Sequence, residues 1–214
     1  RDYQRSRGLG YVYKRQSLEN HRDHYDGTRL GFNPTIKIKM NESTTLDLSY
    51  EHADHERYID RGVPTENGEP VERFEKITFG GDDNLTTLKA NILRATLSKV
   101  FSDTRKGNLS IVSSDFEKMY KNYYASGYTA GATVVTMDGY LDPTERENTI
   151  ISGNIVNEVG NHTLLVGVEL IDTTNENFRY NTFWSTTSDD NEVFNITRPM
   201  DFSVNSAGVA TSND

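Results

Sequence analysis

Apolar and polar side chains alternate with a period of two along most of the chain, which predicts β-strands with one apolar face. The segments TIKIKM and TTLDLSY both show this alternation, and the polar residues NES lie between them. One hairpin register gives both an apolar set and an opposite-charge pair across the strands. That register pairs Met40 with Thr44, Ile38 with Leu46, Ile36 with Leu48 and, on the polar face, Lys37 with Asp47.

Two further hairpins are predicted. One turns at VGNH, and its register pairs Glu158 with Thr163, Ile155 with Val166, Ser152 with Glu169 and Ile151 with Leu170. The other has arms at roughly Leu88–Phe101 and Leu109–Tyr120, joined by SDTRKGN, and its register stays open. Together the three hairpins give about six antiparallel strands.

Connections between the predicted strands alternate strictly between short and long. Those near 41–43, 102–108 and 159–162 are short, whereas those near 55–85, 122–146 and 179–214 are long. All short turns then lie at one end of the sheet, which is the topology of a transmembrane β-barrel with long extracellular loops. Several aromatic residues gather where strands enter the long loops, where an interfacial girdle belongs. These residues are Tyr50, Tyr58, Tyr120, Tyr123, Tyr124, Phe178 and Tyr180.

About six strands cannot close a barrel, because single-chain bacterial barrels begin at about eight. An open sheet edge is not tolerated in lipid. We therefore predict an all-β fold, an antiparallel up-and-down transmembrane β-barrel fragment. Residues 17–214 are interpreted as a partial barrel domain. Residues 1–16 are basic in an acidic chain and join no periodic pattern, so we interpret them as a doubtful, non-native N-terminal segment.

Composition narrows the function. The chain of 214 residues has 23 Lys and Arg against 32 Asp and Glu, a net charge of -9 that disfavours nucleic acid as a partner. It has no cysteine, which excludes disulfides, thiolate catalysis and cysteine-ligated zinc. No sequence motif for nucleophilic, metal or nucleotide chemistry is present, so we predict no catalytic residues, no cofactor and no enzyme activity.

Two weaker signals have ordinary explanations. The segment HADHE places His52 and His55 three residues apart, and in a strand such residues point to opposite faces, so no metal site is predicted there. Five N-x-[ST] sequons are interpreted as coincidences in a chain rich in Asn and Thr. They begin at Asn41, Asn84, Asn108, Asn161 and Asn195.

Five segments together resemble the TonB-dependent siderophore receptors of the bacterial outer membrane. In chain order they are RLGFNPTIKIKM, YIDRGVPTENGEPV, TFGGDDN, ERENTIISGNI and NHTLLVGVEL. The resemblance implies a 22-stranded barrel with an N-terminal plug, of which this chain would hold an early-to-middle block without plug or C-terminal strands. It also implies uptake of a ferric siderophore, driven by the TonB–ExbB–ExbD complex through a missing N-terminal region. Outer-membrane lipid and lipopolysaccharide would surround the barrel.

The siderophore itself would bind the iron, so the protein would contact an anionic, aromatic ligand through cations and rings. Within the family that the chain resembles, this loop pattern together with the DRGVP segment favours a catecholate-type ligand. We predict that the ligand-facing residues lie in extracellular loops and are Arg57, Tyr58, Arg61, Tyr123, Tyr124 and Trp184. The alternatives are a passive porin-like outer-membrane barrel and an extracellular β-sandwich binding module.

Overall fold

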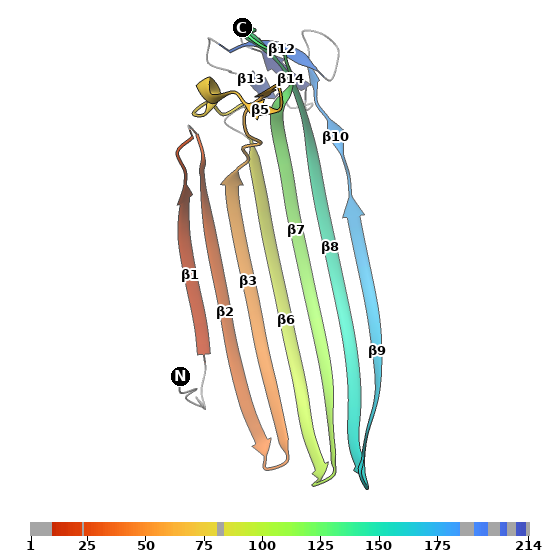
Figure 1. The fold of residues 1–214 in the computed structure, drawn as a ribbon. Coiled ribbons are helices and arrows are strands. Elements are labelled where there is room, and N and C mark those ends of the chain that lie inside the picture. Colours follow the sequence, from red (N-terminus) through yellow and green to blue (C-terminus); the bar gives the residue numbers. More distant parts are fainter. Residues whose placement is uncertain are drawn as a thin grey trace.

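The computed structural model describes residues 10–22, 24–80, 84–184, 191–196, 202–204 and 209–212. Within them, seven long strands follow one another in a single antiparallel sheet of order β1-β2-β3-β6-β7-β8, with β9 also paired to β8 (Figure 1). The short strands β10 and β12 extend this sheet along β8. The long strands are β1 (Gly10–Glu19), β2 (Asp26–Asn41), β3 (Thr44–Tyr58), β6 (Leu85–Ser102), β7 (Arg105–Tyr128), β8 (Val134–Val159) and β9 (His162–Asn177).

The remaining elements are short and lie at one end of the sheet, together with the tips of β7 and β8 (Figure 1). Strands β4 and β5 form a small hairpin, and β11, β14 and β13 form a separate three-stranded sheet. These elements are β4 (Thr65–Glu66), β5 (Glu69–Pro70), the 3-10 helix η1 (Glu72–Phe74), β10 (Tyr180–Asn181), β11 (Phe183–Trp184), β12 (Glu192–Asn195), β13 (Phe202–Val204) and β14 (Val209–Ser212). No helix in the described residues has the length and apolar character needed to cross a membrane.

The predicted registers of the first and last hairpins are confirmed, with one exception. Ile36 pairs with Leu48 and Lys37 with Asp47, and all four pairs predicted between β8 and β9 are present. The prediction that Met40 lies opposite Thr44 is wrong. A register shift between Lys39 and Asn41 places Asn41 opposite Thr44, because an irregularity at the tight turn adds one residue to β2.

The hairpin turns β2–β3, β6–β7 and β8–β9 lie together at one end of the sheet, as predicted (Figure 1). At the other end, the prediction of a long loop over 122–146 is wrong. Strands β7 and β8 remain paired up to Tyr128 and Val135, so that only residues 129–133 connect them. The sequence YKNYYASGY therefore belongs to a hairpin that projects beyond the other strands rather than to an irregular loop.

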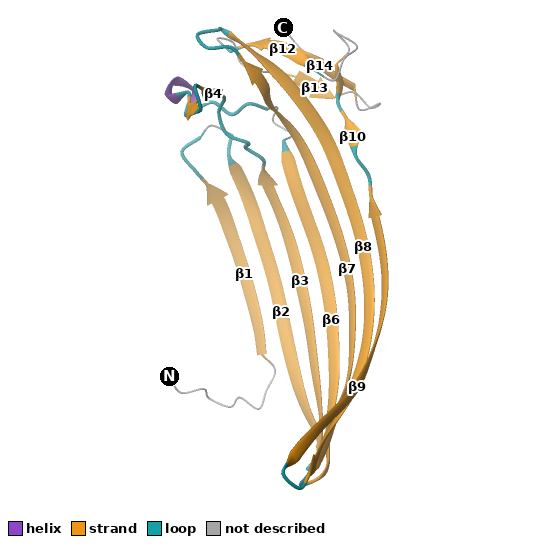
Figure 2. Ribbon diagram, turned by 45° about the vertical axis from the view of Figure 1, so that its right-hand side comes forward, coloured by secondary structure: helices purple, strands orange, loops and turns teal. Residues whose placement is uncertain are grey.

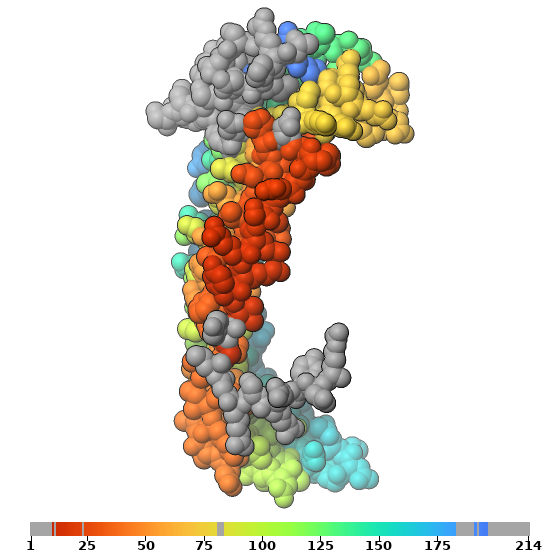
Figure 3. All heavy atoms as spheres, turned by 90° about the vertical axis from the view of Figure 1, so that its left-hand side faces the viewer, coloured from red at the N-terminus to blue at the C-terminus, as the bar shows by residue number. Residues whose placement is uncertain are grey.

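The aliphatic face of the sheet is exposed. Ile111, Ile151 and Leu170 follow one another across β7, β8 and β9 on this face, and their exposed fractions are 45%, 40% and 63%. On the polar face, Ser110 and Ser152 are half-buried, which is expected if the sheet curves with its polar face concave. Figures 2 and 3 show this curved, single-layered sheet. The β-sandwich alternative is therefore wrong for the described residues, since it needs a second sheet to bury the aliphatic face.

The aliphatic side chains form a belt next to the short turns. On β9 the belt runs from Leu164 to Leu170, about 20 Å along the strand at ~3.3 Å per residue. Beyond it, the same face carries Asp172 and Glu176. Aliphatic side chains followed along the same face by a polar surface are the pattern of the lipid-facing band of an outer-membrane barrel.

Strand β1 is an addition to the six predicted strands. Gly10 to Glu19 pair with β2 residue by residue, so part of the segment interpreted as non-native completes a seventh long strand. The prediction missed it because basic and polar residues hide the alternation between Gly10 and Gln16. Every residue of β9, at the other side of the sheet, is exposed.

A small core covers the projecting end of β7 and β8. Tyr123, Val135 and Met137 pack there against Val71, Phe74 and Phe79 of the connection between β3 and β6, and against Phe194 of β12. Phe74 meets Phe79 and Tyr128 edge-to-face, at centroid distances of 5.7 and 5.6 Å. The β3–β6 connection is thereby folded onto the sheet, and it overhangs the hollow side in Figure 3.

Candidate ligand-binding site

Three tyrosines form a row of contacting rings on the concave face, which we name the tyrosine ladder (Tyr120, Tyr140 and Tyr124). Tyr120 and Tyr140 are stacked with centroids 5.9 Å apart, and Tyr124 meets Tyr140 edge-to-face at 6.1 Å. The rings align because residues two apart on a strand share a face and neighbouring strands are in register. The ladder lies about 30 Å along β7 from Ile111, at ~3.3 Å per residue, and so outside the aliphatic belt.

Cations flank the tyrosine ladder. The Arg61 guanidinium lies 4.0 Å from the centroid of Tyr124, and that of Arg179 lies 4.3 Å from Tyr140. The Lys118 amine lies 5.6 Å from the centroid of the Tyr120 ring. Cations at these distances are attracted by the ring faces. They also leave positive charge beside aromatic surface, the combination suited to an anionic aromatic ligand.

Two carboxylates complete the surroundings of the ladder. Asp142 accepts two hydrogen bonds from Arg179, at 2.8 and 2.7 Å, and Asp138 accepts one from the Tyr124 hydroxyl at 2.7 Å. The hydrogen bond from Arg179 lowers the pKa of Asp142, which is therefore ionised at neutral pH. Burial raises the pKa of Tyr120 and Tyr124, and both phenols are therefore neutral at neutral pH. The cations still outnumber the carboxylates around the ladder.

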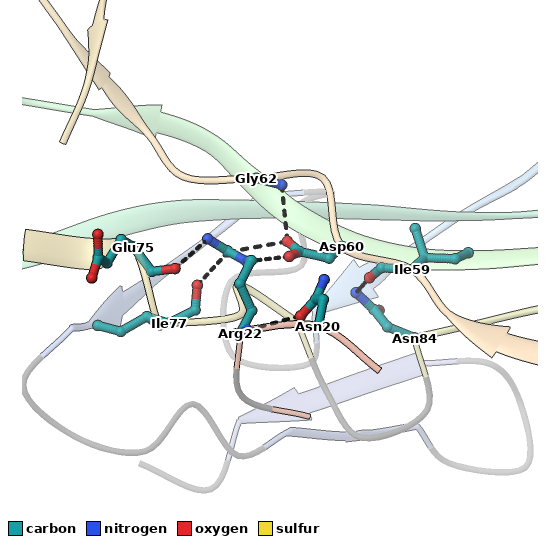
Figure 4. Close-up of polar contacts among 8 residues, drawn as sticks. All are labelled: Asn20, Arg22, Ile59, Asp60, Gly62, Glu75, Ile77 and Asn84. Atoms are coloured by element: carbon teal, nitrogen blue, oxygen red, sulfur yellow. Dashed lines mark hydrogen bonds and ion pairs between the residues drawn. The ribbon is translucent and has the colours of Figure 1, made fainter. Parts of the chain in front are cut away.

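Arg61 is placed by its neighbour Asp60, which forms a buried ion pair with Arg22 from the turn between β1 and β2 (Figure 4). The exposed fractions of the two side chains are only 10% for Arg22 and 8% for Asp60. Arg22 also donates to the backbone carbonyls of Glu75 and Ile77. We name this set of contacts the Arg22 latch.

A glycine turns the chain directly after the latch. The Gly62 N–H donates to the Asp60 carboxylate at 2.9 Å, and the φ of Gly62 is +88°, a conformation that residues with a Cβ rarely adopt. The DRGVP segment therefore has a structural role here: Asp60 anchors the connection, Gly62 turns it, and Arg61 between them reaches Tyr124.

Asn84 anchors the other end of the β3–β6 connection. Its side-chain amide donates to the Ile59 and Tyr123 carbonyls at 3.3 and 2.8 Å, and its oxygen accepts from the Tyr123 N–H at 2.7 Å. Asn84 is 1% exposed. With its side-chain amide buried and hydrogen-bonded, Asn84 is not available for glycosylation in the folded protein, which agrees with the interpretation of its sequon as a coincidence.

Asn84→Ala is expected to lower the free energy of unfolding by about 1–3 kcal/mol, since it leaves buried backbone groups of Ile59 and Tyr123 without partners. Denaturant titration of the protein in lipid vesicles measures this change. Asn148→Ala is the matched control, because it removes a half-buried amide whose hydrogen-bond partners are side chains and not backbone groups. The Asn148 amide donates to the Ser114 hydroxyl at 3.0 Å and accepts from the Thr173 hydroxyl at 3.1 Å. Equal losses for the two variants would contradict the role of Asn84 as an anchor.

The structure brings together three of the six residues predicted to face the ligand. Arg61 and Tyr124 are in contact, and the exposed Arg57 shares the concave face with Tyr120, on whose pKa its charge acts. Tyr58 and Tyr123 are each 3% exposed, and alternation along β3 and β7 points their side chains away from those of Arg57 and Tyr124. We therefore remove both from the candidate site. Trp184 lies in β11, and its side chain is outside the described part of the chain.

Period-two geometry explains this separation. Arg57 and Tyr58 are neighbours in β3, and Tyr123 and Tyr124 are neighbours in β7, so one of each pair must point away from the concave face. The same rule divides the predicted aromatic girdle. Phe178 and Tyr180 are exposed on the outer side and stack at 6.3 Å, whereas Tyr120 and Tyr124 belong to the concave face.

Tyr140 and Arg179 were not predicted as site residues. Their signal was available in the last hairpin, whose predicted register, continued upwards, sets Tyr140 opposite Asn181 as the structure shows. The same continuation places Asp142 level with Arg179, where the two form their ion pair at 2.7 Å. The assignment of 122–146 to a loop stopped the register too early.

His52 and His55 occupy positions of opposite parity in β3, so their side chains lie on opposite faces. His52 contacts the Asn91 side chain at 2.8 Å. Among the described residues, no group of three or more His, Asp or Glu side chains is placed to hold a metal ion.

Comparison with known proteins places the fold. Neither a model of a known protein family nor a curated protein matches the sequence. The ferric-catecholate import receptor Fiu from E. coli K12, in its open form, matches with a TM-score of 0.68 and 16% identity, over 79% of this chain and 30% of that chain. BauA, the ferric preacinetobactin receptor from Acinetobacter baumannii, matches with a TM-score of 0.66 and 13% identity, over 89% of this chain and 29% of that chain.

A third solved structure is P. aeruginosa FpvA bound to heterologous pyoverdines, with a TM-score of 0.64 and 12% identity, over 86% of this chain and 25% of that chain. This chain has the fold of a siderophore-receptor barrel. It spans less than a third of the length of each of these receptors. The seven long strands lie side by side in chain order in one sheet.

Proposed function

We propose that the protein containing this chain is a receptor in the bacterial outer membrane that takes up a ferric siderophore. The observation that carries the proposal is the tyrosine ladder with its flanking cations, on the concave face of a siderophore-receptor barrel fold and beyond the aliphatic belt. A ligand that enters the barrel from outside the cell would meet this surface before it reaches the level of the membrane. The iron is cargo, bound by the siderophore.

A catecholate-type siderophore fits the ladder best. Its aromatic rings carry the oxygens that bind iron, and the complex is anionic, so it offers ring faces and negative charge together. The guanidinium groups of Arg61 and Arg179 are both charged and planar, so each can attract an anion and stack on a ring. An aliphatic hydroxamate has no aromatic ring to stack on them. The fold likeness to Fiu, whose ligand is a ferric catecholate, supports the same choice, while BauA and FpvA bind other siderophores.

Transport needs a source of energy, because a ligand held tightly by the barrel must also be released inward. The sequence resemblance implies that the TonB–ExbB–ExbD complex supplies it through other parts of the protein. The passive porin-like alternative predicts no ligand saturation and no dependence on TonB. Uptake of radiolabelled iron that saturates with siderophore and stops in cells lacking TonB supports the receptor; uptake linear in concentration and independent of TonB supports the porin.

Tyr140→Ala is expected to weaken binding of a ferric catecholate by about two- to thirtyfold, as estimated from the loss of ring and cation contacts worth roughly 0.5–2 kcal/mol. Equilibrium binding to cells producing the intact protein measures this change. The matched control is Tyr180→Ala, which removes an exposed ring from the opposite face of the sheet.

Unchanged affinity in Tyr140→Ala, or an equal loss in both variants, would contradict the ladder as the binding surface. A ferric hydroxamate tested in parallel separates the ligand class from the site. If the hydroxamate binds as tightly as the catecholate and is equally sensitive to Tyr140→Ala, the site stands and the catecholate preference fails.

A further inference from the structure

A groove crosses the aliphatic face near the short turns. It has a volume of about 490 Å³ and is open to the outer side. Its walls are formed largely by aliphatic side chains of β6, β7, β8 and β9, with the backbone of two glycines as its floor. The lining includes Leu97, Leu109, Gly107, Gly153, Ile155 and Val168.

The two glycines create the groove. Gly107 pairs with Ile155 and Leu109 pairs with Gly153, so two neighbouring rows of the outer face each lack one side chain, at positions diagonal to each other. A Cβ on Gly107 would lie 2.8 Å from the Asn154 carbonyl oxygen, so this position admits no side chain without a shift. A Cβ on Gly153 would meet its closest neighbour, a Leu109 methyl group, at 3.7 Å, an ordinary contact. The groove can therefore be filled from Gly153 without strain.

The rim of the groove towards the short turns is basic. Lys99 lines the groove directly, and its amine lies 5.4 Å from the centroid of the Phe101 ring. Arg105 lies two residues before Gly107 on the same face of β7 and donates a hydrogen bond to the Asn157 side chain at 3.1 Å. An apolar groove that ends at two cations is complementary to an amphiphile with an anionic head.

We infer that this groove is a binding site for an anionic phospholipid. One acyl chain lies between the walls over Gly107 and Gly153, and the phosphate lies at Lys99 and Arg105. The groove is continuous with the aliphatic belt, so the occupant arrives from the bilayer that surrounds the belt. This inference rests on the proposed location in the outer membrane, and the cations place the headgroup in the leaflet on the side of the short turns.

The test uses the intact barrel protein reconstituted in phosphatidylcholine vesicles that contain spin-labelled phosphatidylglycerol. Electron paramagnetic resonance measures the immobilised fraction of the labelled lipid. The wild-type protein is expected to immobilise phosphatidylglycerol in preference to labelled phosphatidylcholine, with roughly a fivefold contribution from each cation. Lys99→Gln with Arg105→Gln is expected to remove that preference.

Gly153→Leu fills the groove and is expected to abolish the most strongly immobilised component for both lipids. Ser113→Leu is the matched control, because it adds the same side chain to the same face of the sheet, on β7 instead of β8 and away from the groove lining. The inference is overturned if Gly153→Leu leaves immobilisation unchanged, if Ser113→Leu reduces it equally, or if a second copy of the protein rather than lipid occupies the groove in cross-linking.

The test separates this inference from the proposed function. Failure of the wild-type protein to insert in vesicles would count against the membrane location itself. Normal insertion and normal siderophore binding, with no selective lipid component, would count against the groove alone.

Discussion

Arg22→Ala is expected to release the connection between β3 and β6 from the sheet. Removing one partner of a buried ion pair costs about 3–5 kcal/mol, because the remaining charge stays buried without compensation. In this protein the remaining charge is Asp60, which is only 8% exposed. The carbonyls of Glu75 and Ile77 lose their guanidinium donors in the same substitution. The loss therefore falls on one segment rather than on the whole sheet.

Hydrogen exchange measures this local opening. The amides of Val71, Phe74 and Ile77 all donate within the connection, at 3.0, 2.9 and 2.9 Å. Their exchange is expected to accelerate by roughly two to three and a half orders of magnitude, since each 1.4 kcal/mol corresponds to about tenfold. Amides in the centre of β7, such as that of Ile111, should keep their protection.

Arg22→Lys is the informative second variant. Lysine keeps the charge, but its single ammonium cannot reproduce the planar fork that reaches a carboxylate and two carbonyls at once. Its exchange rates should lie between those of the wild-type protein and Arg22→Ala. Because the latch also places Arg61, siderophore affinity should fall in the same order. Unchanged exchange in Arg22→Ala would show that the hydrophobic contacts of Phe74 and Phe79 hold the connection without the latch.

Leu48→Arg is expected to destabilise the barrel: its free energy of unfolding in lipid vesicles should fall by about 2–4 kcal/mol. This is the cost of placing a cation near the middle of the lipid-facing band. Leu48 pairs with Ile36 and Ala95 and lies in the same row as Ile111, within the belt. The measurement is a denaturant titration at equilibrium in vesicles whose hydrocarbon thickness is close to that of the outer membrane.

Ser110→Arg is the matched control for the orientation of the sheet. Ser110 precedes Ile111 in β7 and faces the concave side, where its cross-strand neighbours Thr96 and Ser152 are uncharged. Its substitution should change the folding free energy by less than about 0.5 kcal/mol, as at other surface positions. If Ser110→Arg proves the more costly of the two, the polar face rather than the aliphatic face contacts lipid.

Much of the sheet could be predicted from the sequence, because period-two alternation fixes which face a residue occupies and cross-strand pairs fix the register. Lys37 with Asp47, for example, is an ion pair at 3.1 Å. Strands are harder to predict where the alternation weakens. Gly10 to Gln16 pair with β2 through backbone hydrogen bonds that make no demand on side-chain polarity, so their strand left no pattern in the sequence.

The candidate site was predicted only in part, for two physical reasons. Tyr123 and Tyr124 were both predicted to face the ligand from a loop. They are neighbours in a strand, so Tyr123 points into the core and Tyr124 to the concave face. The Arg22 latch joins residues 38 positions apart in the chain. Such a contact depends on the packing of two connections against each other, and no local pattern in the sequence records it.

Within the described residues, β1 and β9 are the two margins of the seven long strands, and this has a consequence for how the proposed ligand would be held. In the proposed outer-membrane receptor each unsatisfied backbone group would cost several kcal/mol in hydrocarbon, so both margins of the sheet are expected to be hydrogen-bonded to further strands. We therefore expect the seven long strands to form one arc of a ring in that receptor. A siderophore seated on the tyrosine ladder would touch that arc from one side only, and selectivity would then depend on what the facing arc presents across the opening.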